Sequence, residues 1–143
     1  MEDFWSTTRR YETWMRSHVR VVDDDLVAKH RRMTSESAFV LLRASFYRWA
    51  HQFPELCPDV SAAPIVLGVG DVHVENFGLW RDSEGRLVWG VNDFDECDHL
   101  PYTNDLVRLV TSAVLADGEL DLSEVCREVV RGYRSGMVDG GAP

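Results

Sequence analysis

The amino-acid sequence predicts an α+β domain in which helices pack around a small β-hairpin or sheet. Apolar residues recur at helical spacing before residue 54 and again after residue 103. Between these regions, short apolar runs alternate with glycine and acidic residues, as in strands joined by turns. With 143 residues, of which 45% are hydrophobic, the chain is long enough to bury one core. We therefore expect a single domain over residues 1–138 and a flexible tail over residues 139–143.

Two helices are expected before residue 34. The first covers residues 3–20, because four apolar residues share one face there: Phe4, Tyr11, Met15 and Val19. Three aspartates at 23–25 suit the N-cap and the first turn of a second, shorter helix. That helix should end near Met33.

A third and stronger helix is predicted over residues 36–53. Its apolar residues recur at steps of three and four: Phe39, Leu42, Phe46, Trp49 and Phe53. Pro54 should end this helix, because a proline lacks the backbone N–H that continues it. Residues 54–64 contain three prolines and are expected to form a loop.

The centre of the chain indicates three strands. Residues 65–69 form a short apolar run before Gly70, which is typical of a buried strand. Residues 77–80 and 86–91 suit two further strands joined by a turn in which Gly85 takes a positive φ. We expect these two strands to form a β-hairpin.

Two helices are predicted after the hairpin. A helix over residues 104–116 has an apolar face made of Leu106, Leu109, Val110, Ala113 and Val114. Asp121 and Glu124 have the spacing of a capping box that opens the last helix. Six residues should line the buried side of that helix: Leu122, Val125, Cys126, Val129, Val130 and Tyr133.

Composition excludes several classes of partner. The net charge of −9 argues against a nucleic acid or an anionic membrane surface as the main partner. No apolar run approaches the roughly 20 residues that cross a bilayer, and the N-terminus lacks the features of a secretory signal. The three cysteines form no C-x-x-C pair and fit a reducing compartment. We therefore expect a cytoplasmic protein.

Two acidic clusters lie at the ends of the predicted hairpin. The first contains Asp71, His73, Glu75 and Asn76, and the second contains Asp93, Asp95, Glu96 and Asp98. Folding of the hairpin would bring the clusters together. Carboxylates at such short range repel one another unless a cation or bound protons offset their charge. We therefore expect the clusters to surround Mg²⁺ and a phosphate group.

The spacing within the clusters indicates individual roles. Asp71 and Asn76 are separated as in the catalytic loop of kinases, and Asp93-Phe94-Asp95 follows after a hairpin, where kinases place D-F-G. Asp71 would then act as the catalytic base, and Asn76 and Asp93 would bind Mg²⁺, which prefers oxygen ligands. Phe94 would point into the core.

Other polar residues near the clusters have more than one interpretation. His73 braces the loop or binds a metal, and Glu75 faces solvent or is catalytic. Asp95 is a loop residue or a second metal contact. Asp105 either anchors the catalytic loop through its backbone N–H groups or is an ordinary acid of a first helical turn. Arg43 and Arg108 pair with phosphate, pair with these carboxylates or form simple structural salt bridges.

Three segments closely resemble the bacterial domain-of-unknown-function 2252 family: VGDVHVENFGLWRD, GRLVWGVNDFDE and LPYTNDLVRLVTS. Upstream, RRM and SAFVLLRA are similar to that family's R-M…S-P-F-x-F-F-R-G segment, with Ala38 and Ala44 in place of its proline and glycine. The first segment also resembles the loop of aminoglycoside and choline kinases. The resemblance covers roughly Lys29 to Ala116.

The resemblance implies a protein-kinase-like catalytic-lobe core with Mg²⁺ and ATP as cofactors. Asp71 would be the equivalent of the catalytic base, Asn76 and Asp93 would be metal ligands, and Asp105 would steady the loop. Long members of the family carry a glycine-rich stretch and a lysine-bearing strand after the acidic motifs. This sequence has neither, so we expect the nucleotide-clamping lobe to be absent.

Three functions are compatible with these observations. The first is a kinase-like phosphotransferase that acts on a small molecule or a protein. The second is a non-catalytic remnant that binds a metal, a nucleotide or a partner protein, with a homo-oligomer as one form, because half a fold should expose an apolar patch. The third is a metal-dependent hydrolase that uses the Asp/His cluster, although it lacks a clear second set of metal ligands.

Overall fold

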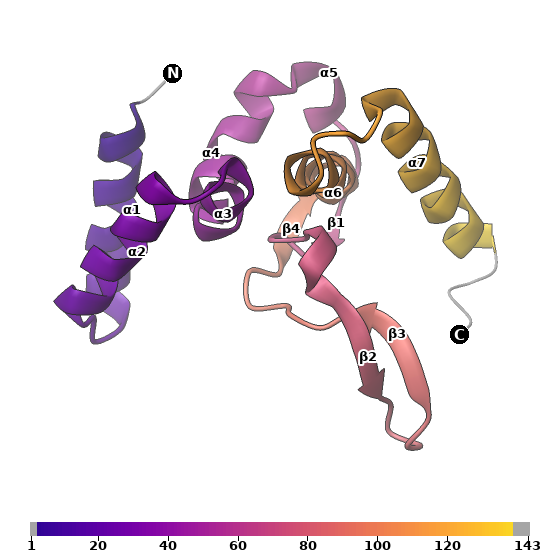
Figure 1. The fold of residues 1–143 in the computed structure, drawn as a ribbon, viewed down its shortest axis with the longest axis horizontal. Helices are drawn as coiled ribbons and strands as arrows, with labels where there is room; N and C mark the ends of the chain where they lie inside the picture. The colour runs from indigo at the N-terminus through magenta and orange to yellow at the C-terminus, as the bar shows by residue number, and fades with distance from the viewer. Residues whose placement is uncertain (1–2, 139–143) are drawn as a thin grey trace. The chain divides into compact units, whose positions relative to one another are not determined.

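The computed structural model describes residues 3–138, and the expected tail over residues 139–143 lies outside them. The chain forms two compact units, residues 1–62 and residues 63–143 (Figure 1). Over the described residues, seven α-helices and two two-stranded antiparallel sheets confirm the α+β class. The expectation of a single domain stays a prediction. None of the helices in residues 3–138 is long and apolar enough to cross a membrane.

The first unit begins with the two expected helices, α1 (Phe4–His18) and α2 (Asp23–Ser35). Asp3 caps α1, since its Oδ1 accepts hydrogen bonds from the backbone N–H groups of residues 5 and 6. The N-cap of α2 is Val22, which offers no side-chain bond. The three aspartates instead occupy the first turn of α2, where their charge favours the positive end of the helix dipole.

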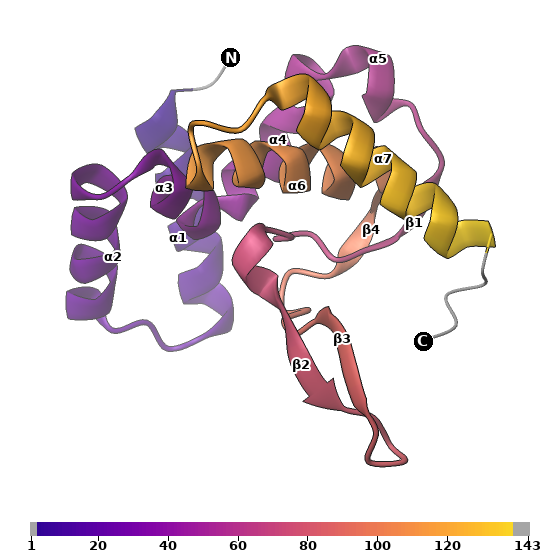
Figure 2. The ribbon, with the colours of Figure 1, turned by 45° about the vertical axis from the view of Figure 1, so that its right-hand side comes forward.

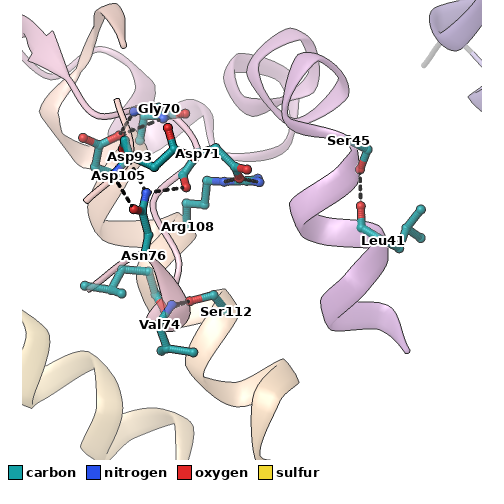
Figure 3. A network of polar contacts seen from close by, with 12 residues as sticks. Leu41, Ser45, Gly70, Asp71, Val74, Asn76, Asp93, Asp105, Arg108 and Ser112 are labelled. Atoms are coloured by element: carbon teal, nitrogen blue, oxygen red, sulfur yellow. Dashed lines mark hydrogen bonds and ion pairs between the residues drawn. The ribbon is translucent and has the colours of Figure 1, made fainter. Parts of the chain in front are cut away.

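The prediction of a single helix over residues 36–53 is wrong in two respects. This segment forms two helices, α3 (Ala38–Ala44) and α4 (Phe46–Leu56). They are separate because Ser45 leaves the helical conformation, and its hydroxyl donates to the carbonyl of Leu41 at 2.6 Å (Figure 3). Pro54 does not end the helix, because a proline in the last turn removes one backbone bond only. The expected loop also contains a short helix, α5 (Pro58–Ser61). The apolar core of this unit is made of Met33, Phe39, Leu42, Phe46 and Phe53.

The second unit contains both sheets. The strands β2 (Phe77–Arg81) and β3 (Leu87–Val91) form the expected hairpin, and Gly85 in its turn has a φ of +79°. Strand β1 (Ile65–Gly68) pairs with β4 (Asp98–Pro101), which the sequence did not predict. The expectation that β1 is buried is wrong. Its first three residues are exposed, as for Leu67 at 70%, because β1 pairs with one strand only and α6 covers it incompletely.

Helices α6 (Tyr102–Ala116) and α7 (Leu122–Val138) complete the second unit; α6 packs against β1 and β4 and also against α7 (Figure 2). A short 3-10 helix (Val74–Asn76) precedes β2. The expected N-terminal cap of α7 is present, because Asp121 accepts from the backbone N–H of Glu124 at 2.9 Å. The prediction that α7 has a buried apolar side is wrong: the residues expected there are exposed or half-buried, since α6 covers only part of that side.

Candidate functional site

The first part of the site is the turn that leaves β1. The carboxylate of Asp105, on α6, accepts from the backbone N–H of Val69 at 2.7 Å and from that of Gly70 at 3.1 Å. Gly70 has a φ of +84°, a conformation that suits glycine. A Cβ on Gly68 would lie 3.2 Å from Asp105 Oδ2, so a side chain there would crowd this anchor. Asp105 therefore lies where a loop-anchoring residue was expected.

The side chain of Asn76 joins the two acidic clusters (Figure 3). Its Oδ1 accepts from the backbone N–H of Asp93 at 2.9 Å, and its Nδ2 donates to the carbonyls of Asp93 at 3.1 Å and Asp71 at 3.3 Å. Because one contact needs an oxygen and the others a nitrogen, the orientation of the amide is fixed. Asn76 is only 5% exposed. The hairpin therefore brings the clusters together, as expected, through a buried amide.

Asp71 forms an ion pair with Arg108 of α6. Both Nε, at 3.0 Å, and Nη2 of Arg108 donate to Oδ1 of Asp71. The Arg108 side chain is 0% exposed, whereas that of Asp71 is 22% exposed. Burial lowers the pKa of Arg108 from its ordinary value, and the charges of Asp71, Asp105 and Glu96 oppose that shift. A buried guanidinium thus offsets the acidic charge next to Asp71.

A stripe of polar residues on α6 contacts the loop that contains Asp71 and Val74. The most buried residues of this helix are Asn104, Arg108 and Ser112, each four positions after the previous one. The hydroxyl of Ser112 accepts from the backbone N–H of Val74 at 3.1 Å and donates to the carbonyl of Leu109 at 2.7 Å. Asn104 and Ser112 were not among the residues predicted to form the site. Their spacing of four with Arg108 is the signal that could have revealed them.

The second cluster lies at the surface. Asp93 is exposed, and its Oδ1 accepts from the backbone N–H of Asp95 at 3.0 Å, which closes a short turn. Asp95 is also exposed. The prediction that Phe94 points into the core is wrong, because its side chain is 54% exposed.

The remaining candidates differ in burial and position. His73 is buried, and its carbonyl accepts from the backbone N–H of Asn76 at 2.9 Å, within the loop that it was expected to brace. Glu75 is exposed, as expected. Arg43 lies on α3 in the first unit, where its guanidinium stands 5.8 Å over the ring of Phe39. It is therefore not among the residues that the second unit brings together.

A family model matches residues 20–142 and describes an uncharacterized protein conserved in bacteria (DUF2252). The chain belongs to the DUF2252 family. No curated protein and no solved structure matches it. The family resemblance carried by the acidic segments is thereby confirmed, and in this DUF2252 chain the matched region includes the whole network around Asp71, Asn76 and Asp93.

The DUF2252 site can be compared with the needs of Mg²⁺. Residues 3–138 contain no group of three or more His, Cys, Asp or Glu side chains placed to hold a metal ion. Mg²⁺ bound together with a nucleotide usually takes only one or two carboxylates, and phosphates and water complete its octahedron. One exposed carboxylate, that of Asp93, and one buried amide oxygen, Asn76 Oδ1, which accepts from the backbone N–H of Asp93, are the donor types that this smaller requirement calls for. The residues present therefore fit a Mg²⁺–phosphate group and do not form a cage for a bare ion.

Proposed function

We propose that this DUF2252 protein is a Mg²⁺- and ATP-dependent phosphotransferase with a kinase-like catalytic-lobe core. The observation that supports the proposal is the Asn76 amide, which ties the backbone of Asp71 to that of Asp93. Phosphoryl transfer requires positioned groups and neutralised charge more than covalent chemistry by the protein. The buried Asn76 amide is hydrogen-bonded to the backbone of both the candidate base and the candidate metal ligand, and it therefore meets the need for positioned groups.

Each residue has a distinct proposed role. The Asp71 carboxylate accepts the proton of a hydroxyl on the phosphoacceptor, a small molecule or a protein, while Arg108 holds that carboxylate in place. Asp93 and Oδ1 of Asn76 would hold Mg²⁺, which would supply charge neutralisation on the phosphates of ATP. Asp105 fixes the turn before Asp71 through the N–H groups of residues 69 and 70. Asp95 is a second contact for the metal–nucleotide group.

Thermal unfolding of the full chain with ATP, with and without Mg²⁺, tests binding. A ligand at 100 times its Kd should add about 2.7 kcal/mol to the free energy of unfolding. Asp93→Asn should abolish the Mg²⁺-dependent part of this shift. Asp98→Asn is the matched control, because Asp98 is an exposed acid of the same cluster outside the proposed ligand set. Absence of any Mg²⁺-dependent shift at millimolar ATP would overturn the proposal.

Turnover is tested separately from binding. With wild-type protein, ADP should accumulate when a phosphoacceptor mixture is added, and Asp71→Asn should stop it. The same variant should keep most of the Mg²⁺-dependent stabilisation by ATP, because Asp71 is not a proposed metal ligand. Loss of binding and turnover together in Asp71→Asn would contradict this division of roles.

A second candidate function, a non-catalytic interaction module, is favoured by the exposed apolar side chains of the second unit. Leu79 and Trp89 face each other across the hairpin, and Trp89 is 69% exposed. Apolar surface of this kind on a soluble domain often marks a contact site. ATP binding without turnover in wild-type protein would favour this function.

We also propose a cytoplasmic location, because Cys57, Cys97 and Cys126 are all free thiols.

A further inference from the structure

The exposed side of α7 borders an apolar groove. The groove lies between α6 and α7, has a volume of about 290 Å³ and is lined mainly by Val107 and Val110 of α6 and by Leu122, Cys126, Val129 and Val130 of α7. On α7 the apolar stripe continues to Tyr133 and Met137, and Met137 is 69% exposed. With about 3.6 residues per turn, these α7 positions fall within an arc of roughly 100°. An amphipathic helix needs a stripe of this width to bury one face against its neighbours.

Arginines flank this stripe along one edge. A second hollow on α7 shares Cys126 and Val130 with the groove and is otherwise lined by Ser123 and by three arginines: Arg127, Arg131 and Arg134. All three arginines are exposed. Arg131 is paired with Glu128, whose Oε2 accepts from Arg131 Nε at 3.0 Å. The whole chain has a net charge of −9, opposite in sign to that of this arginine edge.

We propose that the groove and its arginine edge, together the α7 surface, bind an acidic amphipathic helix of a partner protein. The apolar side chains of that helix would enter the groove, and its Asp or Glu residues would lie over Arg127 and Arg134. Recognition of this kind uses apolar anchors at helical spacing, and complementary charge selects among helices. The inference concerns a surface outside the acidic clusters and does not depend on phosphoryl transfer.

The charges disfavour a second copy of α7 as the occupant. Two antiparallel helices related by a two-fold axis bring the same edge of each helix together. Arg127 and Arg134 would then face the same arginines of the other copy, and like charges at an interface cost free energy. Glu128 pairs with Arg131 and also attracts Arg127, but Glu124 and Glu128 project from the opposite side of the helix from the apolar stripe and so would lie outside such an interface. An acidic partner avoids the repulsion.

Binding of two designed helical peptides to the full chain tests the proposal. Both peptides carry fluorescein, are about 18 residues long and have leucines at i, i+3, i+4 and i+7. One has glutamates beside the leucine stripe, and the other has lysines. Fluorescence anisotropy should show at least tenfold tighter binding of the glutamate peptide at low salt. Equal affinity for the two peptides would overturn the proposal.

Charge reversal gives the sharpest variant. The double change Arg127→Glu and Arg134→Glu should invert the preference, so that the lysine peptide binds more tightly, and Arg20→Glu is the control at an exposed arginine of the first unit. Val130→Asp should weaken both peptides at least tenfold, and circular dichroism should show unchanged helix content. An unchanged preference after charge reversal contradicts the proposal. So does a wild-type dimer that Val130→Asp converts to a monomer, or a Val130-dependent attachment to anionic vesicles.

Discussion

Replacing Asn76 with alanine should destabilise the second unit by about 2–3 kcal/mol. The change removes three hydrogen bonds between the Asn76 amide and the backbone of Asp71 and Asp93. Each bond contributes roughly 1 kcal/mol net, and leaving buried partners unsatisfied raises the cost. The bond to Asp71 is the longest, and water can reach the exposed Asp93, which keeps the total near the sum of three ordinary bonds. Asn76→Asp should be as damaging, because its second oxygen would face two carbonyl oxygens.

Urea unfolding measures this cost through the midpoint at a constant slope. Hydrogen exchange of the Asp93 amide should accelerate in parallel, because that N–H loses its acceptor. Asn92→Ala is the matched control, since Asn92 is the neighbouring asparagine and is exposed. A loss below about 0.5 kcal/mol for Asn76→Ala, the size of an ordinary surface substitution, would refute the view that Asn76 ties the two clusters together.

Three further predictions concern stability. Arg108→Met should cost about 3–5 kcal/mol in urea unfolding because it leaves Asp71 without its buried partner, and a loss below 1 kcal/mol would contradict the importance of the pair. Burial raises the pKa of Tyr47, and its hydrogen bond to Thr8 opposes this shift less strongly. The folded protein therefore keeps the phenol proton at a pH where the unfolded chain loses it, so the free energy of unfolding should fall as the pH rises above roughly 10. Tyr47→Phe should remove this fall, which urea midpoints measured across that pH range would show. Gly70→Ala should cost about 1–2 kcal/mol because of its positive φ, and thermal unfolding of the variant checks this.

The sequence predicted best the elements whose signals are local. The hairpin of β2 and β3 follows from two apolar runs and a turn that needs Gly85. Strand β4 was missed because residues 98–101 show no alternation of their own. They are a strand only because β1 lies beside them, with Leu67 opposite His99. The apolar run of β1 indicates a strand but does not indicate which distant segment pairs with it.

Periodicity identified the helices better than it identified what they bury. The apolar pattern runs without interruption through residues 36–53, yet a single bond from Ser45 to the Leu41 carbonyl accompanies the division of that helix. On α7 the apolar stripe is real, but α6 covers only part of it. A hydrophobic pattern indicates which face of a helix would be stabilised by burial. It does not indicate whether another part of the same chain covers that face.

Helix α6 shows why the candidate site was only partly predictable. Its apolar residues suggested the buried face, but its most buried side chains are Asn104, Arg108 and Ser112. These are buried because a folded loop supplies their partners, such as the Val74 N–H that binds Ser112. Sequence patterns rank residues by hydrophobicity and cannot show partners that exist only after the loop has folded. Asp71, Asn76 and Asp93 could be singled out because their spacing resembles that of kinase motifs, and their chemical role stays a prediction.

Charge balance divides the site into two halves with different needs. The sequence suggested that both acidic clusters require an added cation, yet Arg108 already lies among Asp71, Asp105 and Glu96. The inner half is thus compensated by the protein itself, whereas Asp93 and Asp95 are exposed, so the proposed external cation would bind on their side. If Mg²⁺ binds here, it should therefore depend strongly on Asp93 and weakly on Asp71. The same asymmetry separates the proposed metal ligand from the proposed base, so the two variants Asp93→Asn and Asp71→Asn probe different halves of one network.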